Sequence, residues 1–73
     1  MRRIVVYGKE GCNPCATMKK MLEEAGTKYE YKDIMKNMDD VSKYDLKNVP
    51  TTLVFEGEEV VKKIVGISKE VLL

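Results

Sequence analysis

Two cysteines separated by two residues, Cys12 and Cys15, stand between a short apolar run and an amphipathic pattern, and this junction constrains the fold most. Residues 4–7 are four consecutive apolar or aromatic residues, which predicts a strand over 3–7 that is buried on both faces. From 13 to 25 the apolar residues recur at helical spacing, and Pro14 suits the first turn of such a helix. The sequence therefore predicts that the cysteine pair lies where a buried strand ends and a helix begins.

The middle of the chain predicts one more strand and one more helix. Residues 28–33 alternate charged residues with tyrosines, which favours a half-exposed strand at the edge of a sheet. Residues 37–46 have a weaker helical pattern, which predicts a short helix. The residues of this helix expected to face inward are Met38, Val41 and either Tyr44 or Leu46.

The last third of the chain predicts a β-hairpin followed by a short helix. Residues 51–56 and 59–65 favour strands, and Gly57-Glu58 between them favours a turn. Ser68 can cap a last short helix that runs to Leu73. The order β-α-β-α-β-β-α predicts an α/β fold in which a four-stranded mixed sheet carries helices on both faces, with residues 1–73 as a single domain.

Charge and hydropathy exclude several classes of partner. Lys and Arg number 13 and Asp and Glu 12, so the formal charge of +1 offers no electrostatic basis for binding nucleic acid or an anionic membrane. No apolar run approaches the roughly 20 residues that span a bilayer. The run at 4–7 is also too short for the core of a signal peptide. We therefore expect a cytoplasmic monomer without nucleic-acid or membrane partners.

The spacing of the cysteines indicates reactivity rather than structural cross-linking. A disulfide within one tetrapeptide closes a very small loop and stabilises a fold little, whereas secreted scaffolds spread four or more cysteines along the chain. The N-terminus of a helix stabilises a thiolate through its unpaired N–H groups and its dipole, and lowers cysteine pKa values to roughly 3.5–7.5 from about 8.5. A reactive thiolate is therefore expected at the start of the helix.

The order of the two cysteines predicts their roles. Cys12 comes first, at the mouth of the loop, and is the expected nucleophile. Cys15 lies one turn further on the apolar side of the helix and is the expected resolving thiol. Attack of Cys12 on a substrate disulfide would give a mixed disulfide, which Cys15 would then resolve. Such a reaction needs no bound cofactor, because the redox-active disulfide is itself the redox group.

The segment from Val6 to Cys15 resembles the active-site segment of glutaredoxins and of the glutaredoxin-like redoxins that reduce ribonucleotide reductase. In both, a strand ends in a tyrosine, here Tyr7, and a lysine, here Lys9, stands three residues before the first cysteine. Val49-Pro50-Thr51 resembles the cis-proline loop that faces the cysteines throughout the thioredoxin-fold superfamily, and Gly66 resembles a third signature. The resemblance implies a thioredoxin-like fold over essentially the whole chain.

The resemblance also implies a substrate-binding surface around the cysteines. In the family, backbone groups of the residue before the cis-proline bind the substrate as an added strand. The sequence favours a core position for Tyr7 over a chemical role, and a helix cap over a ligand for Ser68. The candidate substrate-binding residues are Tyr7, Lys9, Asn13, Pro14, Val49, Pro50, Gly66 and Ser68.

Departures from the family pattern bear on the electron donor. The stretch Gly66-Ile67-Ser68-Lys69 has one glycine, and it has Lys69 where glutathione-binding glutaredoxins carry an acid. Pro14 directly precedes the second cysteine, as in thioredoxins, although the chain has no tryptophan. We therefore expect a dithiol reductase of disulfide-containing client proteins, with ribonucleotide reductase as one candidate. Its electrons are expected to come from a thioredoxin reductase-like flavoprotein.

Two alternatives stay open. The first is a glutathione-dependent glutaredoxin, which has the same fold and takes its electrons from glutathione. The second is a metal or iron–sulfur binding module. A tetrahedral zinc site uses four ligands, and this chain has two cysteines and no histidine, so such a module would need carboxylates or a second copy.

Overall fold

Two strands that are distant in sequence form the middle of a single sheet. The computed structural model describes residues 2–72. Strand β1 (Arg2–Gly8) pairs in parallel with β2 (Glu30–Asp33) and antiparallel with β3 (Thr51–Glu56). Strand β3 also pairs antiparallel with β4 (Glu59–Val65), so the strand order is β2-β1-β3-β4. The predicted four-stranded mixed sheet is confirmed, and the edge strand predicted over 28–33 is observed over Glu30–Asp33.

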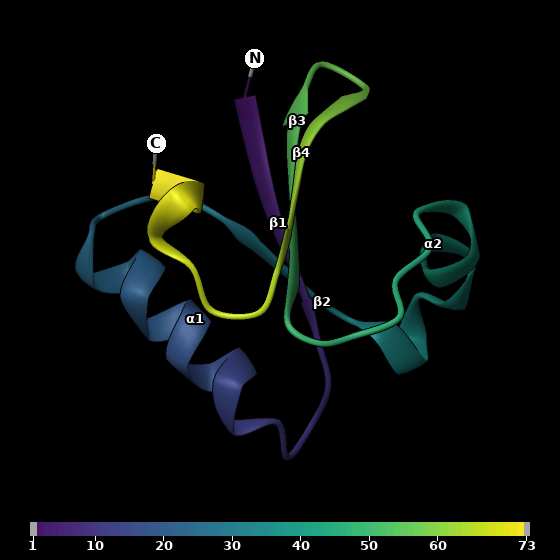
Figure 1. Ribbon diagram of the computed structural model, residues 1–73, viewed down its shortest axis with the longest axis horizontal. Helices are drawn as coiled ribbons and strands as arrows, with labels where there is room; N and C mark the ends of the chain where they lie inside the picture. Colours follow the sequence, from purple (N-terminus) through teal and green to yellow (C-terminus); the bar gives the residue numbers. More distant parts are fainter. Residues whose placement is uncertain (1, 73) are drawn as a thin grey trace.

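Helical segments cover both faces of the sheet (Figure 1). Helix α1 (Asn13–Glu24) lies on one face together with the 3-10 helix η2 (Lys69–Leu72). The 3-10 helix η1 (Ile34–Lys36) and helix α2 (Met38–Lys43) lie on the other face. This arrangement is the predicted α/β architecture.

Alternate residues of β1 point to opposite faces, and they divide the hydrophobic core into two clusters. The cluster beneath α1 holds Met18 and Leu22, which are both fully buried. Burying a side chain of this size contributes about 1.5–3 kcal/mol, so these two residues hold α1 on the sheet. The buried residues of the α1 side are Ile4, Val6, Met18, Leu22, Val54, Ile64 and Val71, and those of the α2 side are Val5, Tyr7, Leu46, Leu53 and Phe55.

The predicted helix over 37–46 is shorter than expected. Asn37 has φ −136° and ψ 49°, which separates η1 from α2, and Asp45 has a positive φ of 54° just beyond the end of α2. Val41 and Tyr44 pack against the core as predicted. The prediction for Met38 is wrong: its side chain is 57% exposed, because it occupies the first position of this short helix.

The last predicted helix is a single 3-10 turn. The Oγ atom of Ser68 accepts a 3.1 Å hydrogen bond from the N–H of Glu70, which confirms its capping position. Val71 from this turn is 1% exposed and fixes the turn against the α1 side of the core. The predicted extension to Leu73 lies outside the described residues.

Candidate active site

The cysteine pair occupies the first turn of α1. Cys12 is the N-cap residue, with an extended backbone, and its Sγ accepts a 3.1 Å hydrogen bond from the N–H of Cys15. Pro14 lies within the first turn, where an N–H would have no intrahelical partner. A disulfide joins Cys12 to Cys15. The positive end of the helix dipole therefore lies at the sulfur of Cys12, where it favours a thiolate.

The two sulfur-bearing residues differ in exposure. Cys15, in the first turn of α1, is 1% exposed, whereas Cys12 is half-buried at the protein surface. A sulfur atom of a second molecule can therefore approach Cys12 but not Cys15.

A tight loop connects the end of β1 to Cys12. The N–H of Cys12 donates a 3.3 Å hydrogen bond to the carbonyl oxygen of Lys9. Gly11, directly before Cys12, has φ +81°, a left-handed conformation that glycine adopts without the steric cost of a Cβ atom. The loop thereby places Lys9 close to the disulfide with its side chain exposed.

The disulfide lies in a cleft of about 350 Å³. Of the predicted site residues, this cleft brings together Lys9, Cys12 and Cys15. It also contains Tyr31 and Asp33 of β2 and Lys19 of α1, which no sequence motif indicates as site residues. Asn13 and Pro14 are exposed on the first turn of α1, beside the cleft.

Gly8 at the end of β1 allows α1 and β2 to approach each other closely. A Cβ atom placed on Gly8 would lie 2.5 Å from the hydroxyl oxygen of Tyr31 and 2.9 Å from Sγ of Cys15. The hydroxyl and the sulfur therefore border the same small space. The Nζ atom of Lys19 lies 4.3 Å from the centre of the Tyr31 ring, within the range of a cation–π contact. Burial, followed by the nearby Asp33 carboxylate, raises the pKa of Tyr31.

The predicted proline loop lies at the same end of the sheet as the disulfide. The peptide bond between Val49 and Pro50 is cis, as the resemblance implies. Pairing of Tyr7 with Thr51 places Pro50, directly before Thr51, beside the end of β1 that leads to the cysteines. The N–H of Gly66 donates a 2.8 Å hydrogen bond to the carbonyl oxygen of Pro50. The structure thus brings Pro50 and Gly66 together, with Ser68 in the cap two residues further on.

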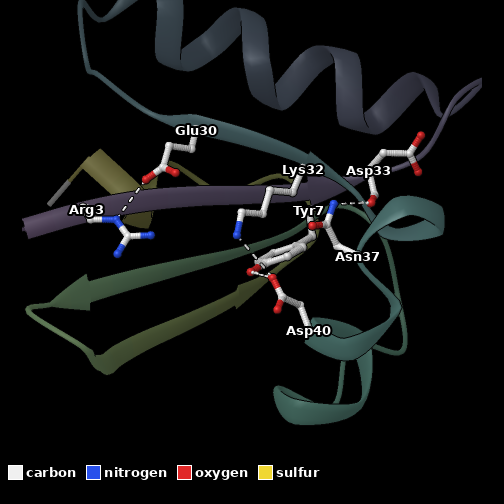
Figure 2. A network of polar contacts seen from close by, with 7 residues as sticks. All are labelled: Arg3, Tyr7, Glu30, Lys32, Asp33, Asn37 and Asp40. Atoms are coloured by element: carbon white, nitrogen blue, oxygen red, sulfur yellow. Dashed lines mark hydrogen bonds and ion pairs between the residues drawn. The ribbon is translucent and has the colours of Figure 1, made fainter.

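Tyr7 lies apart from the cysteines. It is 1% exposed and belongs to the core on the α2 side of the sheet, where its hydroxyl donates a 2.8 Å hydrogen bond to Oδ2 of Asp40 (Figure 2). It borders a second hollow of about 380 Å³, together with Lys32 and Tyr44. The reason is the alternation of side chains along β1, which turns Tyr7 to the face opposite α1. The structure places Tyr7 in the core rather than in the disulfide cleft.

Comparison with known proteins assigns the family. A sequence profile of the family named Glutaredoxin matches residues 4–61, a stretch that includes both cysteines and the cis-proline. The chain belongs to the glutaredoxin family. Its relatives among curated proteins include the thioredoxin of Buchnera aphidicola, 33% identical in an alignment 76 positions long that covers 96% of this chain and 70% of the relative. The thioredoxin of Staphylococcus aureus is 31% identical in an alignment 70 positions long that covers 88% of this chain and 67% of the relative.

The fold of this glutaredoxin-family chain is shared with thioredoxins of known structure. The solution structure of oxidised thioredoxin from Plasmodium falciparum matches it with a TM-score of 0.80, at 21% identity, over 97% of this chain and 73% of that one. The predicted thioredoxin-like fold is confirmed. The family match and the thioredoxin relatives also confirm the predicted activity: the chain is a thiol–disulfide oxidoreductase, and the disulfide of Cys12 and Cys15 is its redox group.

The described part of the chain offers no ready-made metal site. Within residues 2–72, no three His, Cys, Asp or Glu side chains gather closely enough to hold a metal ion. None of the helices in that range combines the length and the apolar character that crossing a bilayer needs.

Proposed function

We propose that this glutaredoxin-family oxidoreductase reduces protein disulfides by a dithiol mechanism in which Cys12 attacks and Cys15 resolves. The observation that carries the proposal is the difference in exposure between them: Cys12 is half-buried, and Cys15 is 1% exposed. Cys12 can meet a client disulfide, whereas the buried Cys15 can reach the resulting mixed disulfide from within the protein and displace the client. The position of Cys12 at the helix N-cap supports its role as the thiolate.

We assign the client chain to the surface around the exposed first turn of α1. Lys9, Asn13 and Pro14 are exposed there, and Val49 is half-buried in the loop before Pro50. The hydrogen bond from the N–H of Gly66 to the carbonyl oxygen of Pro50 fixes the loop that carries Val49. Because Ser68 uses its Oγ atom to cap η2, its assigned role in binding is secondary to that cap.

The electron donor in this proposal is a thioredoxin reductase-like flavoprotein, and ribonucleotide reductase is a candidate client. The likeness to thioredoxins supports this choice over glutathione. Lys69, exposed next to Ser68, puts a positive charge where glutathione-binding glutaredoxins hold an amino group. An assay that follows NADPH consumption should show turnover of a protein disulfide with thioredoxin reductase. Turnover only with glutathione and glutathione reductase would reject this donor and establish the glutathione-dependent alternative.

Two serine variants test the roles of the cysteines. Cys12→Ser should abolish disulfide reduction. Cys15→Ser should instead form a stable mixed disulfide with a client protein, visible as a reductant-sensitive adduct by mass spectrometry. If Cys15→Ser turned over protein disulfides at the rate of the parent protein, the dithiol mechanism would be wrong. Anaerobic preparations with stoichiometric iron or zinc would support the metal-binding alternative.

A further inference from the structure

Three elements meet beside the buried sulfur of Cys15. The hydroxyl oxygen of Tyr31 from β2 and Sγ of Cys15 from α1 both border the position that a Cβ atom on Gly8, at the end of β1, would occupy. The parallel register pairs Tyr31 with Val6, which turns the Tyr31 side chain to the α1 face of the sheet. Side chains from two different elements therefore converge where glycine leaves room for them.

The Tyr31 hydroxyl is available as a hydrogen-bond donor. It makes no hydrogen bond to another residue of the described range in the disulfide form. Its pKa is raised, by burial and then by Asp33, so the phenol keeps its proton through neutral pH. The contact of Lys19 with the face of the ring holds the side chain over the cleft.

We propose that, once the disulfide is reduced, the Tyr31 hydroxyl donates a hydrogen bond to the sulfur of Cys15 and stabilises it as the thiolate that resolves the mixed disulfide. The proposal rests on the proposed roles of Cys12 and Cys15. Cys15 is 1% exposed, and a charge buried to that extent is costly unless a donor satisfies it.

The step that this contact assists conserves electrons and sulfur bonds. The Cys15 thiolate attacks Sγ of Cys12, the Cys12–Cys15 bond forms, and the bond between Cys12 and the client sulfur breaks. The client leaves as a thiolate and takes a proton from water. The client has then gained two electrons, and the cysteine pair has lost two.

Other charged groups line the same cleft and nearly cancel. Lys9 and Glu10 come from the loop before α1, Lys19 from α1 itself, and Asp33 from β2. Two positive and two negative side chains leave the local charge close to zero. The net charge of the cleft therefore does not decide between the thiol and the thiolate of Cys15, whereas the Tyr31 hydroxyl can favour the thiolate by donating a hydrogen bond.

The test is the pH profile of the resolving step in Tyr31→Phe, which keeps the ring and removes only the oxygen. A mixed disulfide with a peptide thiol is formed on Cys12, and its decay is followed by acid quench and mass spectrometry. A hydrogen bond to a charged group shifts a protonation midpoint by about one pH unit or more, so the midpoint of the variant should rise by about that amount.

The expected effect of Tyr31→Phe on the rate of resolution reverses with pH. A thiolate from a less acidic thiol is a better nucleophile, with a Brønsted coefficient of about 0.4–0.5. Well below the midpoint, a roughly tenfold loss of thiolate should outweigh this gain and slow resolution by roughly threefold. Above both midpoints, the variant should resolve roughly threefold faster. A purely structural defect would slow the step at every pH.

Tyr29→Phe is the matched control, because its hydroxyl bonds to Glu23 at 2.6 Å and does not border the cleft. This control should keep the parent pH profile. A Tyr31→Phe profile that overlays the parent profile, or that is lowered uniformly without a shifted midpoint, would overturn the proposal. Cys15→Ser tests the proposed roles of the cysteines separately from the role of Tyr31. If Cys15→Ser traps the mixed disulfide while Tyr31→Phe has no effect, only the role of Tyr31 is rejected.

Discussion

The Tyr7 hydroxyl donates a 2.8 Å hydrogen bond to Oδ2 of Asp40, on the face of the sheet opposite the disulfide (Figure 2). Nζ of Lys32 lies 3.3 Å from the same oxygen. The hydrogen bond from Tyr7, together with the charge of Lys32, holds the pKa of Asp40 below its usual range. Burial and the bond to Asp40 raise the pKa of Tyr7 in turn. These contacts tie the central strand β1 to helix α2.

Asp40→Asn should reduce stability without impairing disulfide reduction. Because the pKa of Asp40 is lowered by folding, its carboxylate stabilises the fold above about pH 4, and this contribution is lost as the pH falls through the lower folded value. Urea titrations at pH 7 should show a loss of about 1 kcal/mol in the variant. The difference between variant and parent should shrink as the pH falls below about 4. A difference that stays the same from pH 7 into the acid range would contradict this assignment.

Gly8→Ala should destabilise the protein and disturb the disulfide cleft. The added methyl group would stand 2.5 Å from the Tyr31 oxygen, so that side chain or Cys15 must move. Overpacking of this kind costs about 1–3 kcal/mol. The double variant with Tyr31→Phe should lose less than the sum of the two single losses, because removing the oxygen relieves the closest contact. If the losses in free energy of unfolding from the two substitutions were strictly additive, the contact between the added methyl group and the Tyr31 oxygen would be excluded.

Thr52→Val should stabilise the protein. Thr52 is fully buried, and its Oγ1 atom has no hydrogen-bond partner among the described residues. Replacing this unsatisfied hydroxyl with a methyl group of similar size should raise the free energy of unfolding by about 1 kcal/mol. The neighbouring substitution Thr51→Val is the control, because Oγ1 of Thr51 donates a 2.6 Å hydrogen bond to the carbonyl oxygen of Asn48. That variant should be less stable than the parent. Equal changes in the free energy of unfolding in the two variants would show that the hydrogen bond of the threonine does not determine the effect.

Substitutions of Ser68 distinguish capping from substrate binding. Ser68→Ala removes the acceptor for the N–H of Glu70 and should lower stability by about 1 kcal/mol. Ser68→Asp keeps a capping oxygen and should retain most of that stability. If Ser68 acts only as a cap, the KM for a protein disulfide should stay unchanged in both variants. A KM that rises equally in both would instead place the serine in the binding surface.

The fold could be predicted from the sequence where turn residues mark the limits of an element. The bounds of β3 and β4 match the prediction, because Gly57 takes a positive φ of 64° in the turn between them. Helix α2 was harder to predict because its ends depend on two unusual backbone conformations, at Asn37 and Asp45, in residues that also fit helices.

Only part of the site could be predicted from the sequence, because local motifs mark some of its residues and not others. The cysteine pair and the cis-proline belong to local motifs, so sequence alone indicates them. The approach of Tyr31 to Cys15 depends on the register that pairs Tyr31 with Val6, which spans 25 positions of the chain and leaves no local pattern. Tyr7 was named a candidate for the binding surface because the resemblance places a tyrosine at the end of this strand, and four consecutive apolar residues in β1 do not reveal which of them faces α1.

The strand that carries the disulfide at its end is an interior strand of the sheet, bonded to β2 on one side and to β3 on the other. A fluctuation that separates β1 from the sheet must therefore disrupt pairing with two neighbours at once. Such openings belong to the least frequent motions of a folded domain. We therefore expect the amide protons of β1 to be among the slowest to exchange, so that cycles of oxidation and reduction at the cysteines leave the sheet beneath them assembled.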